Sequence, residues 1–135
     1  MLREHEIAIR VRYSETDAQG ALHHSQYANY FEMGRTELFR AGGGDYRAME
    51  RAGLFFVVSQ LSCKYHRPAR YDDLLTLRTR ILRISQAKLE HEYLLFRGED
   101  HLTTGRTVLA CVDAAGKIQR IPEVLERVMN NDRAQ

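Results

Sequence analysis

The sequence predicts an α+β fold in which one long helix packs against a five-stranded antiparallel sheet. Three observations support this prediction: an alternating strand pattern near the start, one long helical stripe after it, and four strand-like runs in the second half. Runs that follow one another through short links usually pair as antiparallel neighbours. The chain has 135 residues, of which 44% are hydrophobic. We therefore expect a single domain over residues 1–135 with its own hydrophobic core.

The first three elements follow from the periodicity of the apolar side chains. Residues 5–13 alternate between apolar and polar side chains, a pattern typical of a half-buried strand. Residues 14–24 are polar and predict a loop. A helix capped by Ser25 is expected over residues 25–41, because apolar side chains recur there at helical spacing. These side chains are Tyr27, Tyr30, Phe31, Gly34 and Leu38. The glycine among them predicts that the helix lies close to the sheet.

Glycines mark the end of this helix, and a strand follows. The run Gly42–Gly44 is a strong helix stop. Asp45 is expected to cap a second, short helix that Gly53 closes. A long strand is then predicted from Leu54 onward, and Pro68 ends it. Its apolar face is expected to comprise Phe55, Val57, Leu61, Cys63 and Tyr65.

Three more strands complete the predicted sheet, over residues 73–84, 88–97 and 102–112. In the first of them the apolar phase slips between Ile81 and Leu82, which indicates a β-bulge. A final amphipathic helix is expected after Pro122, where the chain again shows helical periodicity. Since one helix covers only one face of a sheet, we expect the other face to need a partner, and the chain to form an oligomer.

Charge and composition exclude several classes of protein. The net charge is +2, from 20 basic and 18 acidic residues spread along the chain, which argues against a nucleic-acid-binding protein. The densest basic stretch, residues 64–70, suits a small phosphorylated ligand better. The first residues lack the apolar core of a secretory signal, and no run is long enough to cross a membrane. We expect a soluble, cytoplasmic protein. Its two cysteines, Cys63 and Cys111, are expected to be buried reduced thiols.

The loop at residues 14–24 has the residue types that acyl transfer requires. Asp17 lies a few residues before a helix start, and a helix start presents unpaired backbone N–H groups. Such groups can stabilise an oxyanion, while a nearby carboxylate acts as base or nucleophile. Residue types alone leave an alternative open, because an aspartate in a polar loop is more often a turn or cap residue. His23 and His24 lack metal-ligand spacing, so no metal site is expected.

Two segments resemble one family of thioesterases. Residues 13–37, YSETDAQGALHHSQYANYFEMGRTE, contain a T-D-x-x-G loop, then H-x-x-Y and F-x-x-x-R. Residues 65–79, YHRPARYDDLLTLRT, match a Y-x-x-P-A-x-x-D-x-L pattern. Both segments are similar to those of the 4-hydroxybenzoyl-CoA thioesterase / YbgC-like family, and they occur in the same order. The resemblance implies a hotdog fold, in which the sheet wraps around the long helix.

The resemblance also implies an activity, which is hydrolysis of an acyl-CoA thioester to a free acid and CoA. No cofactor is implied, because coenzyme A is part of the substrate. The family forms dimers that often pair into tetramers, with CoA bound across the subunit interface, so a homotetramer is an expectation here. In the family's pattern Asp17 stands at the essential carboxylate. His24 stands where a backbone N–H faces the thioester carbonyl. Its side chain is also a candidate for orienting Asp17 or for donating a hydrogen bond to that carbonyl.

Further positions are candidates for binding the substrate. Tyr27 matches the helix aromatic that shapes the pocket. Gly20 belongs to the loop at residues 14–24, which we call the acid loop. His23 is either a pocket residue or solvent-exposed. Arg67 and Arg70 are candidates for contacting CoA phosphates, because arginine pairs well with phosphate oxygens; the alternative is solvated loop charge.

Several alternatives stay open. Glu32 is a second candidate carboxylate, although an ion pair with Arg35 is its simpler role. The substrate is either an acyl-CoA or an acyl group on acyl-carrier protein; a non-catalytic acyl-CoA-binding protein and a dehydratase are further possibilities. The chain departs from the family at Gln19, Ala21 and His23, beside the expected acyl pocket, which leaves the acyl specificity undetermined.

Overall fold

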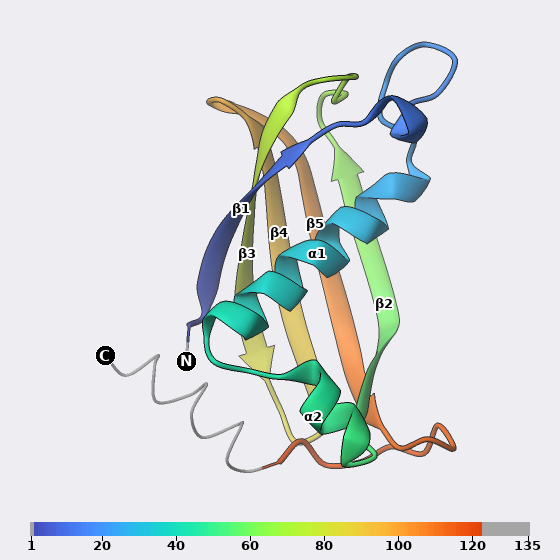
Figure 1. The fold of residues 1–135 in the computed structure, drawn as a ribbon, viewed down its shortest axis with the longest axis vertical. Helices are drawn as coiled ribbons and strands as arrows, with labels where there is room; N and C mark the ends of the chain where they lie inside the picture. Colours follow the sequence, from blue (N-terminus) through green and yellow to red (C-terminus); the bar gives the residue numbers. More distant parts are fainter. Residues whose placement is uncertain (1, 123–135) are drawn as a thin grey trace.

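The computed structural model describes residues 2–122 and contains one five-stranded sheet with one long helix (Figure 1). The order of elements along the chain is β1 (Glu4–Arg10), a 3₁₀ turn (Tyr13–Glu15), α1 (Ser25–Ala41), α2 (Tyr46–Arg51), β2 (Phe55–Tyr65), β3 (Leu74–Ile84), β4 (Lys88–Arg97) and β5 (Asp100–Val112). Every strand pair is antiparallel, and the order across the sheet is β1-β3-β4-β5-β2. The predicted α+β architecture is confirmed.

Helix α1 crosses one face of the curved sheet, as Figure 1 shows. Its buried side chains are Tyr27, Tyr30, Phe31, Gly34, Leu38 and Phe39, so the predicted stripe is confirmed. A Cβ atom at Gly34 would collide with the Thr79 hydroxyl and lie 2.8 Å from Cδ2 of Leu77. The glycine therefore allows the close approach of helix and sheet that the sequence predicted.

The core divides into two clusters along α1. The first lies under the N-terminal half of the helix, where the rings of Phe31 and Tyr93 stack with centroids 4.4 Å apart. The second lies under the C-terminal half and includes Leu38, Phe39 and Leu109. Because the first cluster fixes the N-terminal half of α1 on the sheet, it also fixes the start of the helix, where the candidate site lies.

Other predictions for the elements are confirmed or corrected. The register of β3 against β4 shifts between Ile81 and Arg83, which confirms the predicted bulge. The Asp45 side chain accepts a hydrogen bond from the Ala48 N–H and caps α2 as expected. Ser25 does not cap α1: it is the first residue of the helix, and the cap position is His24. The helix predicted after Pro122 lies outside the described residues.

The predicted face of β2 was wrong over its first half. A second bulge shifts the register between Val58 and Gln60, so the residues before and after it do not keep one phase. As a result Phe56, rather than Phe55, packs against the second core cluster. The expected burial of the cysteines holds for Cys111, while Cys63 is only half-buried.

The sheet face away from α1 carries a network of ion pairs. Glu92 lies between Arg80, at 2.7 Å, and Arg106, at 3.5 Å. On the neighbouring strands Arg78 forms ion pairs with Glu4 and Glu6. Exposed apolar side chains lie along the edge strand β2 instead, namely Val57, Val58, Leu61 and Tyr65. None of the helices within residues 2–122 is long and apolar enough to span a membrane.

Candidate active site

A buried carboxylate anchors the start of the acid loop. The 3₁₀ turn Tyr13–Glu15 brings Glu15 under α1, where it is 6% exposed. Its Oε1 accepts hydrogen bonds of 2.8 Å from the Arg12 backbone N–H and from the Tyr30 hydroxyl. Its Oε2 lies 3.2 Å from the Arg12 guanidinium. The loop is thus fixed to the long helix at its first residues.

These contacts decide the charge of Glu15. Burial by itself would raise the pKa of this carboxyl, since a charge is costly in the interior. The hydrogen bonds from Arg12 and Tyr30 outweigh burial and hold the pKa below the ordinary value of 4.5. For Tyr30 both burial and the bond to Glu15 raise the pKa of the phenol. At neutral pH the pair is therefore an ionised carboxylate and a protonated phenol.

Asp17 closes a tight turn in the loop. Its Oδ1 accepts backbone N–H bonds from Gln19 at 2.9 Å and from Ala21 at 3.1 Å. Gly20 adopts φ +78°, a conformation that glycine takes without strain. Within residues 2–122, Oδ2 of Asp17 receives no hydrogen bond, and the side chain is exposed. The carboxylate is held by one oxygen and keeps the other free.

The link between β2 and β3 binds this loop through its backbone. The Leu22 N–H donates to the Ala69 carbonyl at 2.8 Å, and the Tyr71 N–H donates to the Gly20 carbonyl at 3.2 Å. Within the loop, Thr16 and Leu22 form an isolated antiparallel bridge. Asp17 directly follows this bridge in the chain. Two segments that are distant in sequence, which both carry family-like motifs, are therefore in contact.

The start of α1 is shaped by two stacked imidazoles. The rings of His23 and His24 lie 4.1 Å apart. The Ser25 backbone N–H donates to Nδ1 of His23 at 3.2 Å, and the Ser25 hydroxyl lies 2.8 Å from the same nitrogen. Within residues 2–122 no hydrogen bond uses the backbone N–H of His24. The helix therefore begins with a free donor at the position where the sequence predicts an oxyanion site.

An apolar cleft of about 270 Å³ lies beside this helix start. It is lined by Leu22, His24, Tyr27, Tyr65, His66, Arg67 and Pro68. Tyr27 is buried in its wall and meets the Tyr65 ring edge-on at 4.8 Å. Burial raises the pKa of both phenols, that of Tyr65 to about 12. Both hydroxyls therefore stay protonated and can donate hydrogen bonds at neutral pH.

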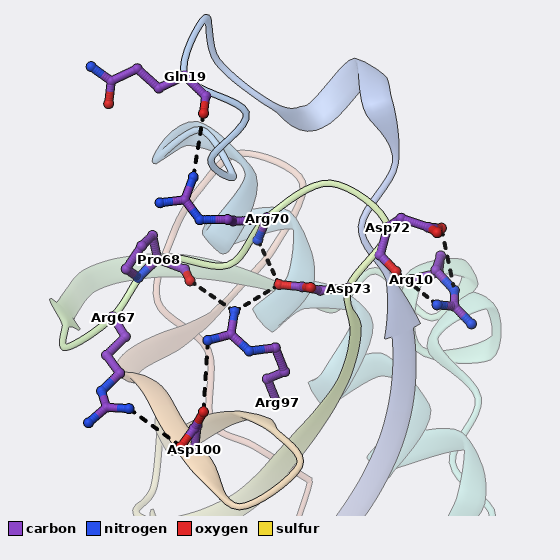
Figure 2. A network of polar contacts seen from close by, with 9 residues as sticks. All are labelled: Arg10, Gln19, Arg67, Pro68, Arg70, Asp72, Asp73, Arg97 and Asp100. Atoms are coloured by element: carbon purple, nitrogen blue, oxygen red, sulfur yellow. Dashed lines mark hydrogen bonds and ion pairs between the residues drawn. The ribbon is translucent and has the colours of Figure 1, made fainter.

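Not all predicted site residues line this cleft. His24, Tyr27 and Arg67 do, whereas Asp17, Gly20, His23 and Arg70 do not. Arg67 pairs with Asp100 at 3.4 Å, and Arg70 donates to the Gln19 carbonyl at 3.4 Å, as Figure 2 shows. Both arginines are exposed. Their guanidinium groups already have protein acceptors, which a phosphate would have to replace.

Larger hollows within residues 2–122 are less suited to a thioester. One of about 480 Å³ is bordered by Glu90 and Arg106, and one of about 440 Å³ by Arg40, Asp45 and Arg47. They are charged and lie away from the helix start, so we place the site at the smaller cleft. The second candidate carboxylate, Glu32, is exposed and pairs with Arg35 at 3.7 Å. No group of three or more potential metal ligands occurs in the described part of the chain.

The sequence missed Glu15, Tyr65 and Arg97 as contributors to the site. The Glu15 carboxylate accepts the Arg12 backbone N–H as the glutamate of a capping box does, but Arg12 lacks the accepting side chain of that motif, so its sequence pattern does not mark this turn. Tyr65 was assigned to the strand face and to the second motif, but to no part of the site. Nothing local marks the role of Arg97 on the link between β2 and β3, because its partners there, Pro68 and Asp73, lie 24 or more residues away in the chain.

Comparisons with known proteins find thioesterases. The model of the thioesterase superfamily matches residues 19–104. A protein of Aquifex aeolicus is 38% identical over 118 residues, covering 87% of this chain and 91% of its own length. The acyl-CoA thioesterase YbgC of Haemophilus influenzae is 34% identical over 114 residues, covering 84% and 83%. The crystal structure of DHNA-CoA thioesterase from Staphylococcus aureus superposes with a TM-score of 0.92 at 26% identity, covering 97% and 91%.

Proposed function

The chain belongs to the thioesterase superfamily, and from this premise we propose that it hydrolyses acyl-CoA thioesters to a free acid and CoA. Asp17 supplies the carboxylate, and the start of α1 supplies the oxyanion site. Relatives of similar length that are named as acyl-CoA thioesterases support this substrate class.

One observation carries the proposal: the residue with a free backbone N–H at the start of α1 also lines an apolar cleft. The donor belongs to His24, which itself lines the cleft. A backbone donor at a helix N-terminus stabilises the negative charge that develops on a thioester oxygen during attack. The apolar walls suit the acyl group and exclude water from it.

The chemistry then needs one group to form the new bond to the acyl carbon. In one route Asp17 takes a proton from water as the water oxygen attacks the carbonyl carbon. In the other, a carboxylate oxygen of Asp17 attacks directly and forms a mixed anhydride, which water then hydrolyses. In both routes the C–S bond breaks, and the CoA sulfur leaves as a thiolate that takes up a proton. The free Oδ2 of Asp17 supports either role.

The rim of the cleft suits the phosphates of CoA. Arg67 and Arg70 lie on the link between β2 and β3, and Arg67 lines the cleft. Their present acceptors are one carboxylate and one backbone carbonyl, both at 3.4 Å. Contacts of that length at an exposed position are weak, so a phosphate can replace them.

We also propose that two chains join along β2. The two edge strands differ in chemistry, because β1 carries outward Glu4, Glu6 and Arg10 whereas β2 exposes Val57, Val58 and Leu61. An exposed apolar edge is a template for pairing with a second strand, while charges protect an edge from it. Such a dimer brings the cleft, which includes Tyr65 of β2, close to a second subunit.

The test is a thiol-release assay with wild type, Asp17→Asn and a matched control. Asp113 is the control, because its Oδ1 also accepts two backbone N–H bonds, from Ala115 and Lys117, both at 2.9 Å. If the Asp17 carboxylate takes part in the reaction, Asp17→Asn lowers kcat by about 10²–10⁴-fold. Asp113→Asn leaves kcat within about twofold, because it perturbs only a turn.

The substrate panel contains benzoyl-CoA, short-chain and long-chain acyl-CoAs, and the same acyl groups on acyl-carrier protein. Turnover of one CoA class names the substrate. Turnover of the carrier-protein esters alone would show that the substrate is an acyl group on acyl-carrier protein rather than an acyl-CoA. If both aspartate variants match wild type, Asp17 only closes a turn, and Glu32 becomes the carboxylate to test.

A further inference from the structure

An arginine at the end of β4 contacts both ends of residues 68–73, the part of the β2–β3 link that binds the acid loop. Arg97 is the last residue of β4. Its Nη1 donates to the Pro68 carbonyl at 3.3 Å and to Oδ2 of Asp73 at 2.9 Å. In Figure 2 the guanidinium lies between Pro68, Asp73 and Asp100. One side chain therefore fixes residues 68–73 at their beginning and end.

The two carboxylates beside Arg97 also contact other arginines of the link. Oδ2 of Asp73 also accepts the Arg70 backbone N–H at 2.8 Å. The second nitrogen of Arg97 lies 3.9 Å from Asp100, which in turn pairs with Arg67. The side chains of Arg97 and Asp73 are 35% and 22% exposed, so this ion pair is more sheltered than the one between Arg67 and Asp100.

Residues 68–73 transmit this support to the acid loop. Three hydrogen bonds link the two segments: Leu22 N–H to the Ala69 carbonyl, Tyr71 N–H to the Gly20 carbonyl, and the Arg70 guanidinium to the Gln19 carbonyl. The loop residues in these bonds surround the turn that Asp17 closes.

Residues 68–73 also form a turn that contains a residue in a strained backbone conformation. Asp72 has φ +68°, a conformation that a non-glycine residue adopts only at some cost. Arg10 holds it from the β1 side by donating to the Asp72 carbonyl at 2.8 Å. Arg97 holds the same turn from the β4 side. A turn with such internal strain keeps its shape only while its surroundings hold it.

We propose that Arg97 is a positioning residue for the reaction, acting through residues 68–73 on the loop that carries Asp17. The inference rests on the proposed function. Without Arg97 the loop samples wrong positions for the carboxylate, while the cleft walls on α1 and β2 remain in place. Loss of the guanidinium therefore lowers kcat more than it raises KM, because small displacements of a reacting group are costly in rate.

The experiment compares Arg97→Gln, Arg97→Lys and Arg80→Gln. Arg80 is the matched control, because it also pairs across strands, with Glu92 at 2.7 Å, on the face away from α1. We expect Arg97→Gln to lower kcat by about 10-fold or more with KM within about threefold. Arg97→Lys recovers part of this loss, since it keeps the charge but not the forked geometry. Arg80→Gln leaves both constants near wild type.

A double-mutant cycle with Asp73→Asn separates positioning from simple destabilisation. If Arg97 acts through Asp73, the double variant has a kcat no lower than that of the slower single variant. If the losses multiply, the two residues act independently and the proposed path is wrong.

Hydrogen exchange gives a readout that does not depend on activity. We expect the Leu22 and Tyr71 amides to exchange faster in Arg97→Gln and unchanged in Arg80→Gln. Unchanged exchange together with unchanged kcat would overturn the inference. If wild type hydrolyses no thioester, the proposed function fails, and the exchange rates still decide whether Arg97 holds the loop.

Discussion

The contact between Tyr30 and Glu15 offers a stability test whose sign depends on pH. Tyr30→Phe removes one hydroxyl from a fully buried ring without changing its shape. The Glu15 carboxylate then loses one of the two 2.8 Å bonds to Oε1 and keeps that from the Arg12 N–H. A hydrogen bond to a buried charge contributes about 1.5–3 kcal/mol. We expect the free energy of unfolding to fall by about that amount at pH 7.

The pH dependence follows from the lowered pKa of Glu15. A carboxyl whose pKa is lower in the folded state than the ordinary 4.5 stabilises the fold when ionised. This stabilisation is complete above the unfolded pKa and is lost as the pH falls through the folded pKa. The Tyr30 hydroxyl supplies part of this stabilisation. The difference in free energy of unfolding between wild type and Tyr30→Phe is therefore constant above about pH 5.5 and shrinks below pH 4.5.

Urea unfolding followed by circular dichroism at pH 7, 5.5 and 4 measures this difference. Equal slopes of the transitions confirm that the two proteins expose the same surface on unfolding. A loss below about 0.5 kcal/mol at pH 7 would show that Glu15 does not depend on the phenol. A loss that stays constant down to pH 4 would show that the bond does not involve an ionised carboxylate.

Two further predictions concern packing and assembly. Gly34→Ala lowers the free energy of unfolding by about 1–2 kcal/mol, because overpacking against Leu77 and Thr79 exceeds the gain in helix propensity, and thermal unfolding measures it. A more stable variant would show that α1 can move away from the sheet. Light scattering is expected to give twice the chain mass of 15.7 kDa for wild type, and close to a single chain mass for Val58→Lys on the β2 edge. Ala8→Lys on the β1 edge keeps the wild-type mass, and a monomeric wild type would refute the dimer.

The sequence by itself determined the elements of the fold and their order. Local signals were sufficient for this, because helix caps, glycine stops and side-chain periodicity act within a few residues. The helix stripe with its close approach at Gly34 and the bulge after Ile81 were both predicted and confirmed. Which side chains of β2 face the core was not predicted correctly, because the bulge at residues 58–60 has no marker in the apolar pattern.

The same division applies to the candidate site. The two motifs predicted where the acid loop and the helix start lie, and the family to which the chain belongs. Only the tertiary structure decided that Glu15 is buried as an ionised anchor, that the cleft takes Tyr65 from β2, and that Arg97 supports the turn at residues 68–73. Each of these depends on contacts between residues far apart in the chain. Local sequence carries no signal for such contacts, since they exist only once the sheet has brought the strand ends together.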